Sequence, residues 1–207
     1  MIQEGLTVGL LEVNCYIIGD EQTKEAVVID PGGDEDEILE VLKRHQLNLK
    51  YIIDTHGHFD HVDANLPLRE ATGAQIAIHE ADAQMLSAPS AEAMFFTGNR
   101  LRLSQADLIL KENDIISFGS YRLKVLHTPG HTPGGISLVM EGHPYVYVGD
   151  LLFNGSIGRT DFPGGSFDAL IDAVRTKIFP LGDHYTVYPG HGPVTTVGHE
   201  RKYNPFF

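Results

Sequence analysis

Three imidazoles and one carboxylate lie within six consecutive residues of this chain. The segment THGHFDH, at positions 55 to 61, contains His56, His58, Asp60 and His61. In a chain with 11 histidines among 207 residues, chance would produce the pattern H-x-H-x-D-H on the order of one time in a thousand. Such side chains cannot all be buried without partners, so they must face water or bind a partner such as a cation. The segment therefore favours a metal site over a polar loop.

Other ligand-type residues follow strand-like runs in the same way. Residues 51–54 are followed by THGHFDH, residues 122–127 by His131, residues 144–148 by Asp150, and residues 185–188 by His191. A glycine directly precedes a ligand-type residue each time: Gly57, Gly130, Gly149 and Gly190. We expect these glycines to allow tight, often φ-positive turns and to leave room for an ion and a substrate. Four such turns predict that one rim of the fold gathers these side chains into a single site.

The elements that position this rim are short β-type runs with helices between some of them. The predicted strands are 14–19, 25–33, 49–54, 74–80, 120–127, 135–140, 144–150 and 185–190. A helix is predicted over 35–46, where Asp34 and Glu37 resemble a capping box. A second helix is predicted over 166–179, with Ser166 as its N-cap. The pattern favours sheets covered by helices.

The candidate ligands are too many for one tetrahedral ion, which takes four ligands, or three and a water when it is catalytic. They are His56, His58, Asp60, His61, His131, Asp150 and His191. In extended backbone, alternate residues point the same way, so His56 and His58 can bind one ion together. The adjacent residues Asp60 and His61 lie past the turn and can serve a second ion. The set therefore fits two neighbouring ions.

Composition limits the class of protein. A chain of 207 residues with 42% hydrophobic content fits one large domain or at most two small ones. Its 28 acidic and 15 basic residues give a net charge of −13, which disfavours nucleic acid and anionic membranes as partners. No segment resembles a signal peptide or a membrane span, so we expect a cytoplasmic protein. The single cysteine, Cys15, lies in an apolar run and is predicted to be a core residue.

The motif His56, His58, Asp60, His61, with the later His131, Asp150 and His191 and the upstream Asp30, resembles the metallo-β-lactamase superfamily. The resemblance covers essentially the whole chain and implies an α/β fold, a four-layer αββα sandwich forming a single domain over residues 1–207. It also implies His56, His58 and His131 on a first metal, Asp60, His61 and His191 on a second, and Asp150 between them. Asp30 would orient a ligating imidazole. From its local sequence alone, Asp30 could equally start the turn at Pro31.

Two adjacent ions can supply hydroxide at neutral pH and polarise the attacked oxygen, so hydrolysis is the expected reaction. Asp60 and Asp150 are the expected catalytic carboxylates. The cofactor prediction is two divalent ions, with zinc favoured and iron or manganese also suited to nitrogen and oxygen ligands.

Three features resemble the glyoxalase II-like branch, the hydroxyacylglutathione hydrolases, and more closely its short bacterial type without the C-terminal helical domain. They are Asp150 after PYVYVG, the segment NGSIGRTDFPGGS and the ending YPGHGPVTTVGHERKYNPFF. The resemblance implies a small-molecule thioester substrate, S-2-hydroxyacylglutathione. Arg159 fits a basic glutathione-contacting position, but Asp161 replaces the tyrosine two residues on. Arg159 could bind a substrate carboxylate or could pair with Asp161. The tail residues His199, Arg201, Lys202 and Tyr203 could add contacts or form a solvated terminus.

Four alternatives remain open. A persulfide dioxygenase would hold one iron through His56, His131 and Asp150. A β-lactamase is disfavoured because Asp150 stands where a thiolate ligand would be and because no export signal is seen. The charge disfavours a nuclease, and a metal-binding module without activity is the weakest candidate.

His127, four residues before His131, is predicted to be a packed or hydrogen-bonded residue rather than a ligand.

Overall fold

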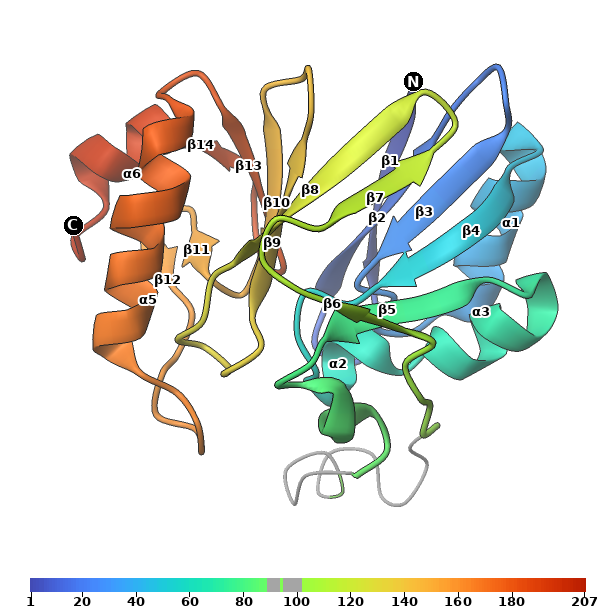
Figure 1. Cartoon of the computed structure of the whole chain (residues 1–207), viewed down its shortest axis with the longest axis horizontal. Helices are drawn as coiled ribbons and strands as arrows, with labels where there is room; N and C mark the ends of the chain where they lie inside the picture. Colours follow the sequence, from blue (N-terminus) through green and yellow to red (C-terminus); the bar gives the residue numbers. More distant parts are fainter. Residues whose placement is uncertain (89–93, 95–101) are drawn as a thin grey trace.

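Two mixed β-sheets face each other, and helices cover their outer faces (Figure 1). The computed structural model describes residues 1–88, 94 and 102–207. Within this part of the chain, no helix has the length and apolar character needed to cross a membrane.

The first sheet has six strands in the spatial order β1-β2-β3-β4-β5-β6. Their bounds are β1 Ile2–Val8, β2 Val13–Gly19, β3 Glu25–Ile29, β4 Asn48–Ile53, β5 Gln75–His79 and β6 Leu108–Leu110. The first three strands pair antiparallel, whereas β3 to β6 pair parallel. The ends of β3, β4 and β5 therefore lie at one edge of this sheet.

The second sheet also has six strands, in the order β14-β13-β10-β9-β8-β7, and β11 and β12 form a separate small ladder. The bounds are β7 Ile115–Phe118, β8 Tyr121–His127, β9 Ile136–Met140, β10 Tyr145–Gly149, β11 Leu152–Phe153, β12 Ser156–Ile157, β13 Thr186–Pro189 and β14 Thr195–Thr196. The pairs β8 with β9 and β9 with β10 are antiparallel, and β10 with β13 is parallel. Strands β8, β10 and β13 therefore run in one direction and end at one edge.

The helices lie in two groups, one against each sheet (Figure 1). Against the first sheet are α1 Glu35–His45, α2 Phe59–Val62, α3 Asn65–Thr72 and the 3₁₀ turn η1 Ala83–Leu86. Against the second are α5 Phe167–Ala173, the π-helical η2 Val174–Ile178, the 3₁₀ turn η3 Phe179–Leu181 and α6 Val197–Tyr203.

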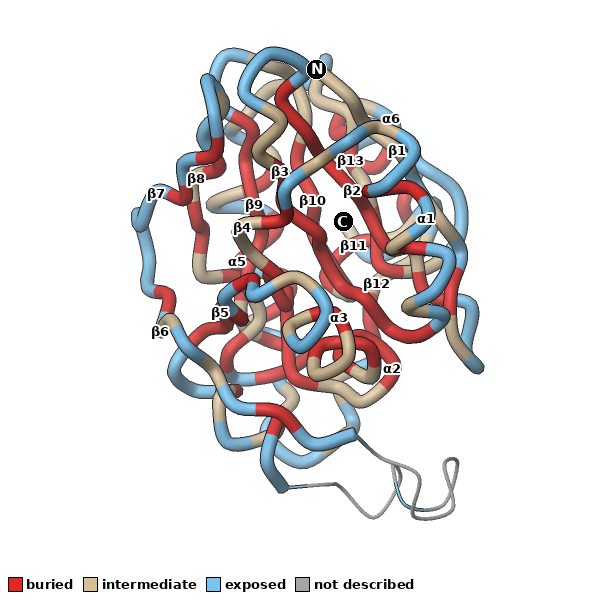
Figure 2. Tube along the Cα trace, turned by 90° about the vertical axis from the view of Figure 1, so that its right-hand side faces the viewer, coloured by how far each residue is buried: buried red, intermediate tan, exposed pale blue. Residues whose placement is uncertain are grey.

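Alternation of apolar residues along the strands fills three separate layers of core. On β3, Ala26 and Val28 pack toward α1, whereas Val27 and Ile29 pack between the sheets. Successive strand residues point to opposite faces, so a strand with both faces buried reads as continuously apolar. A third core lies between the second sheet and α5 to α6. Figure 2 shows the buried trace following the strands of both sheets. The predicted four-layer αββα sandwich is confirmed, and the buried Cys15 belongs to the first core.

The helix predictions hold in position but not in every detail. Ser166 does cap α5, because its hydroxyl accepts from the Ala169 N–H at 3.3 Å. The capping box predicted at Asp34 is wrong. Asp34 has a left-handed backbone with φ of 50° and no side-chain bond to its own helix. Its carboxylate instead accepts from the Gly9 N–H at 2.8 Å. The predicted continuous helix over 166–179 is also wrong in type, since it changes at Val174 into π and then 3₁₀ geometry.

The core between the sheets holds the two halves of the site rim together, so we predict that Phe118→Ala destabilises the fold. Phe118 lies on β7 and is fully buried in this core. Removing a buried Phe side chain costs about 3–5 kcal/mol, measured as the free energy of unfolding in urea. Ile109→Ala on β6 is the control, because Ile109 is 47% exposed and should change that free energy by no more than about 0.5 kcal/mol. Equal losses for the two variants would contradict the assignment.

Candidate metal centre

The structure brings together all seven ligand-type residues predicted from the sequence. His56 and His58 follow β4, and α2 carries the next two, Asp60 and His61. The other three lie in the turns after β8, β10 and β13, and are His131, Asp150 and His191. The residues converge because β4, β8, β10 and β13 all end at the same end of the sandwich.

The first group of ligand atoms belongs to His56, His58 and His131, and these atoms lie within 4.8 Å of one another. The His58 Nδ1 and His131 Nε2 atoms are 2.9 Å apart. His56 Nε2 is buried and has no hydrogen-bond partner among the described residues. Three imidazole nitrogens directed at one small volume form the kind of site that a divalent ion would satisfy.

The second group consists of Asp60, His61 and His191, again within 4.8 Å. His61 Nε2 and His191 Nε2 are 3.3 Å apart, and His191 Nε2 lies 3.3 Å from Asp60 Oδ2. Between the two groups, Asp150 directs Oδ1 toward His61 Nε2 at 3.5 Å and Oδ2 toward His131 Nε2 at 3.6 Å. Its carboxylate therefore contacts both groups.

Buried polar groups behind the imidazoles fix their orientation. Asp30 accepts from the Thr55 N–H and hydroxyl, both at 2.7 Å, and its Oδ2 is 3.1 Å from His61 Nδ1. The Thr55 hydroxyl is also 3.1 Å from His56 Nδ1. Asp30 adopts a left-handed φ of 52°, an uncommon conformation for a residue other than glycine. Asp30 thus begins the turn at Pro31 and also contacts the imidazole of His61. The two interpretations raised by the sequence are therefore compatible.

His131 is oriented by a group that the sequence did not reveal. Its Nδ1 donates to the Arg159 backbone carbonyl at 2.7 Å. A carbonyl can only accept, so the proton resides on Nδ1 and the Nε2 lone pair is directed at the site. Sequence patterns do not report backbone carbonyls, whereas Thr55 could have been noticed as the residue directly before His56.

Electrostatics divide the site into two halves. Burial and the neighbouring imidazoles lower the pKa of His58 to about 3 and hold the pKa of His56 well below its usual range. Burial alone would lower the pKa of His61, but the carboxylates of Asp150 and Asp60 outweigh it and raise that pKa to about 10. Burial would also raise the pKa of Asp60, yet His61 and His191 hold it below its usual range. At neutral pH, His56 and His58 are therefore neutral imidazoles with free lone pairs, whereas His61 is protonated beside ionised carboxylates. Neutral imidazoles and carboxylates are the forms that bind metal ions, so an ion at the second group would have to displace the proton of His61.

The glycines before the ligands act in two ways. Gly130 and Gly149 have positive φ values of 137° and 52°, as predicted for tight turns. Gly57 and Gly190 do not, and they are needed for space instead. A Cβ on Gly190 would lie 2.3 Å from Asp150 Oδ1 and 2.8 Å from His61 Cε1. The expectation of φ-positive turns therefore holds at only two of the four positions.

A cavity of about 380 Å³ opens over the ligand cluster. Its walls are largely apolar and aromatic, from Leu11, Phe59, Phe153, Ile157 and Phe162, and Arg159 also lines it. A cleft with apolar walls and polar groups at its base is the usual form of a small-molecule site.

Arg159 pairs with Asp161, which was one of the two alternatives raised by the sequence. Its Nε and Nη2 donate to the two Asp161 carboxylate oxygens, both at 2.8 Å. The guanidinium also lies 3.7 Å from the centre of the Phe162 ring. The side chains of Arg159 and Asp161 are 55% and 69% exposed, so water screens the pair strongly.

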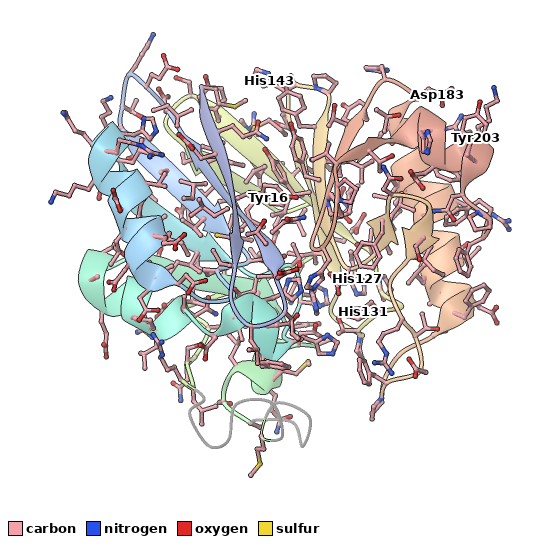
Figure 3. The ribbon with its side chains drawn as sticks, turned by 180° about the vertical axis from the view of Figure 1, so that it is seen from behind. Tyr16, His127, His131, His143, Asp183 and Tyr203 are labelled. Atoms are coloured by element: carbon pink, nitrogen blue, oxygen red, sulfur yellow. The ribbon has the colours of Figure 1, made fainter. Side chains whose placement is uncertain are left out.

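His127 and the tail residues lie outside the ligand cluster. His127 Nε2 contacts the Pro133 carbonyl at 2.9 Å, and its ring stacks on that of His79 with centroids 4.1 Å apart. The prediction of a packed, hydrogen-bonded His127 is confirmed. On α6, Arg201 bonds the Phe179 carbonyl and pairs with Asp183 at 3.1 Å. Figure 3 shows Tyr203 well apart from His131, which favours the solvated terminus over substrate contacts.

A protein-family comparison matches residues 8–191 to the metallo-beta-lactamase superfamily. The chain belongs to this superfamily. It is 37% identical to the Haemophilus influenzae protein named hydroxyacylglutathione hydrolase GloC, over 98% of this chain and 96% of the relative. It is also 34% identical to the Bacillus subtilis probable metallo-hydrolase YqgX, over 97% and 95% of the two chains.

Several solved structures match the whole fold of this chain. The BLEG-1 B3 metallo-beta-lactamase has a TM-score of 0.93 at 35% identity, covering 99% of both chains. TTHA1623 in a di-iron-bound form has a TM-score of 0.88 at 34% identity, and the match covers 99% of this chain and 100% of that one. ETHE1 from Myxococcus xanthus has a TM-score of 0.83 at 32% identity, and the match covers 99% of this chain and 84% of that one. This chain is therefore similar both to a protein named as a hydroxyacylglutathione hydrolase and to one named as a B3 metallo-beta-lactamase.

We predict that Gly190→Ala impairs metal binding while the chain stays folded. The new methyl group would press against Asp150 and His61 and push both from their positions. The expected result is at least a tenfold loss of zinc affinity, measured by competition with a chelator, with an unchanged circular dichroism spectrum. Gly5→Ala is the control, because a Cβ there meets only the Tyr16 ring at an ordinary 3.7 Å. Wild-type affinity in Gly190→Ala would show that the site tolerates the methyl group.

Proposed function

We propose that this protein is a binuclear metal-dependent hydrolase of thioesters, with S-2-hydroxyacylglutathione as its substrate class. The observation that carries the proposal is the pair of ligand groups on either side of Asp150, at the base of a cavity. The similarity to the Haemophilus influenzae hydroxyacylglutathione hydrolase supports the choice of substrate. A cytoplasmic location and a single-domain chain over residues 1–207 belong to the same proposal.

The donor set fits two divalent cations. His56, His58 and His131 would hold one, Asp60, His61 and His191 the other, with Asp150 contacting both. When bound, a pair of such ions supplies hydroxide at neutral pH and polarises the attacked carbonyl oxygen. We propose zinc, although iron and manganese also suit nitrogen and oxygen donors, and a 34% identical relative has been solved in a di-iron form.

The remaining roles belong to side chains and backbone groups of the chain itself. Asp30, Thr55 and the Arg159 carbonyl keep the imidazoles in the orientation that directs their lone pairs inward. The apolar wall excludes water from the bound acyl group and strengthens electrostatic interactions within the site. Hydrolysis breaks the carbonyl C–S bond and yields a carboxylic acid and a thiol. Because a thiol has a pKa of about 8.5, it can leave as thiolate with little help from a general acid.

A second candidate is β-lactam hydrolysis, favoured by the similarity to the BLEG-1 B3 enzyme along the whole chain. The same seven residues would hold the ions, and the chemistry they supply would serve hydrolysis of a β-lactam amide in place of a thioester. The persulfide dioxygenase alternative requires one iron on His56, His131 and Asp150. In this structure His131 Nε2 lies nearer to His58 Nδ1, at 2.9 Å, than to Asp150 Oδ2, at 3.6 Å. That grouping favours a histidine triad for the first ion.

We predict two ions per chain by elemental analysis and hydrolysis of S-lactoylglutathione by the metal-loaded protein. His191→Ala should retain about one ion and lose at least 100-fold in kcat/KM, because it removes one of the three ligands of the second group. His143→Ala is the matched control, since His143 lies at the opposite end of the sandwich from His131 (Figure 3). It should leave both quantities unchanged.

Three results would contradict the proposal. Nitrocefin turnover without thioester hydrolysis would establish the β-lactamase alternative. Oxygen uptake with glutathione persulfide by protein containing one iron would establish the dioxygenase. Full thioester hydrolysis by His191→Ala would show that the second group is not needed.

The Arg159 to Asp161 pair predicts a specific effect on anionic substrates. Asp161 competes with a substrate carboxylate for two N–H donors of Arg159. Asp161→Asn should therefore lower KM for S-lactoylglutathione about two- to fivefold with little change in kcat, since an exposed ion pair contributes at most about 1 kcal/mol.

The control for that effect is Asp183→Asn. Asp183 forms another exposed ion pair, with Arg201 on α6. This variant should leave KM unchanged. If KM rises or stays constant in Asp161→Asn, Arg159 does not contact the substrate carboxylate.

A further inference from the structure

The first ligand group depends on two loops that belong to different sheets. His56 and His58 follow β4 of the first sheet, whereas His131 follows β8 of the second. His58 and His131 are 73 residues apart in the sequence, yet their nitrogens are 2.9 Å apart. A metal site needs its ligands held within about 0.5 Å of the productive geometry. Something must therefore fix the distance between these loops.

The carboxylate of Asp82 bonds to both loops. Asp82 lies in the turn between β5 and η1 and is fully buried. Its Oδ2 accepts from the Gly57 N–H at 3.1 Å, and its Oδ1 accepts from the Gly134 N–H at 2.7 Å. Gly57 stands between His56 and His58, and Gly134 is three residues after His131. One side chain thus joins the two loops without touching a ligand.

Both donors are glycines for a steric reason. A Cβ on Gly134 would lie 2.6 Å from both Cγ and Oδ1 of Asp82. A Cβ on Gly57 would lie 2.7 Å from Met85 Cβ and 3.1 Å from the Asp82 carbonyl oxygen. A side chain at Gly134 would therefore collide with the carboxylate itself, and one at Gly57 would collide with Met85 and the backbone beside it. The pair of glycines and the aspartate therefore form one built arrangement.

A second connection joins the turn that holds Asp82 to the loop that holds Gly134, through the stacked rings of His79 and His127. His79 accepts the Asp82 N–H on its backbone oxygen at 3.1 Å. Its ring stacks on His127, with an interplanar angle of 5°. His127 in turn contacts the carbonyl of Pro133, the residue before Gly134, at 2.9 Å. His127 thus adds a second link between the Asp82 turn and the loop after β8.

We infer that Asp82 is a positioning residue that sets the spacing between His131 and the pair His56 and His58. This inference rests on the metal centre proposed above. A carboxylate suits the role because both of its oxygens accept hydrogen bonds, whereas an amide offers one acceptor and one donor group. Asp82→Asn should therefore keep one of the two bonds, and Asp82→Ala should lose both.

The first measurement uses the metal-free protein and so does not depend on the proposed activity. Hydrogen exchange by NMR reports the protection of the Gly57 and Gly134 amides. Asp82→Asn should reduce the protection of at least one of them tenfold or more, with little change at Val125 in the core between the sheets. Asp107→Asn is the control, because Asp107 accepts the Ile76 N–H at 3.0 Å at the far end of β5. It should leave Gly57 and Gly134 protected.

The second measurement is zinc affinity in the His191→Ala background, where the His56, His58 and His131 group is left to bind the ion. Loss of a group that orients metal ligands typically weakens binding 10- to 100-fold, and we expect that range for Asp82→Asn, with a larger loss for Asp82→Ala. Asp107→Asn should bind zinc as its parent does. A lower thermal midpoint with unchanged zinc affinity would show that Asp82 only stabilises the fold, and would overturn the inference.

The two proposals fail in different ways. If the unaltered protein binds no zinc, the metal centre proposed above is wrong, and the role of Asp82 in it is wrong as well, even if exchange shows the linkage. If the protein binds two ions and Asp82→Asn matches it in both measurements, only the role of Asp82 is refuted. Should the Asp82 variants fail to fold, Gly134→Ala decides, because its Cβ would lie 2.6 Å from Cγ and Oδ1 of Asp82 and would force the loop and the carboxylate apart. A threefold or greater loss of zinc affinity supports the linkage, and unchanged affinity overturns it.

Discussion

Seven lone-pair donors must converge on a space of a few ångströms, and the segments that carry them belong to two different sheets. The packing of the two sheets and the backbone bonds between them meet this constraint. The sheets face each other across a continuous apolar core, and backbone bonds cross between them near the site. The Ile136 N–H donates to the Thr55 carbonyl at 2.9 Å, and the Asn14 N–H donates to the Gly190 carbonyl at 2.7 Å. Close-packed interiors resist small displacements, so a rigid sandwich keeps donors from opposite halves in register.

Buried carboxylates do much of this positioning as acceptors. Asp30 binds Thr55 and contacts His61, and Asp82 binds the amides of two loops. Each is almost completely buried, which is costly for a carboxylate unless its oxygens are hydrogen-bonded. Charge-assisted bonds to N–H groups are shorter and stronger than neutral ones. Burial of these carboxylates costs free energy, and the hydrogen bonds that offset this cost also fix their geometry.

The fold does not determine which substrate this site accepts. Relatives above 30% identity include a hydroxyacylglutathione hydrolase and a B3 metallo-beta-lactamase. Function lies in the site rather than in the fold, and the ligand cluster sets only the reaction class. In the function proposed here, discrimination between substrates falls to the cavity wall above the cluster, with its apolar residues and the Arg159 to Asp161 pair. An arginine already engaged by a neighbouring carboxylate is a weaker receptor for a second one.

The sequence alone identified the seven ligand-type residues that the structure brings together and the central strands, because both depend on local patterns. Fully buried strands are continuously apolar, and all eight predicted runs contain strands. The edge strands β1, β6, β7 and β14 escaped prediction, because strands such as β1 and β7 are partly exposed and carry a weaker apolar pattern. Only the tertiary structure decided that Asp34 bonds Gly9 instead of capping its helix, that the Arg159 carbonyl orients His131, and that Asp82 joins two loops 25 and 52 residues away. These bonds form between groups brought together by sheet packing, and nothing in the local sequence records which partner will be near.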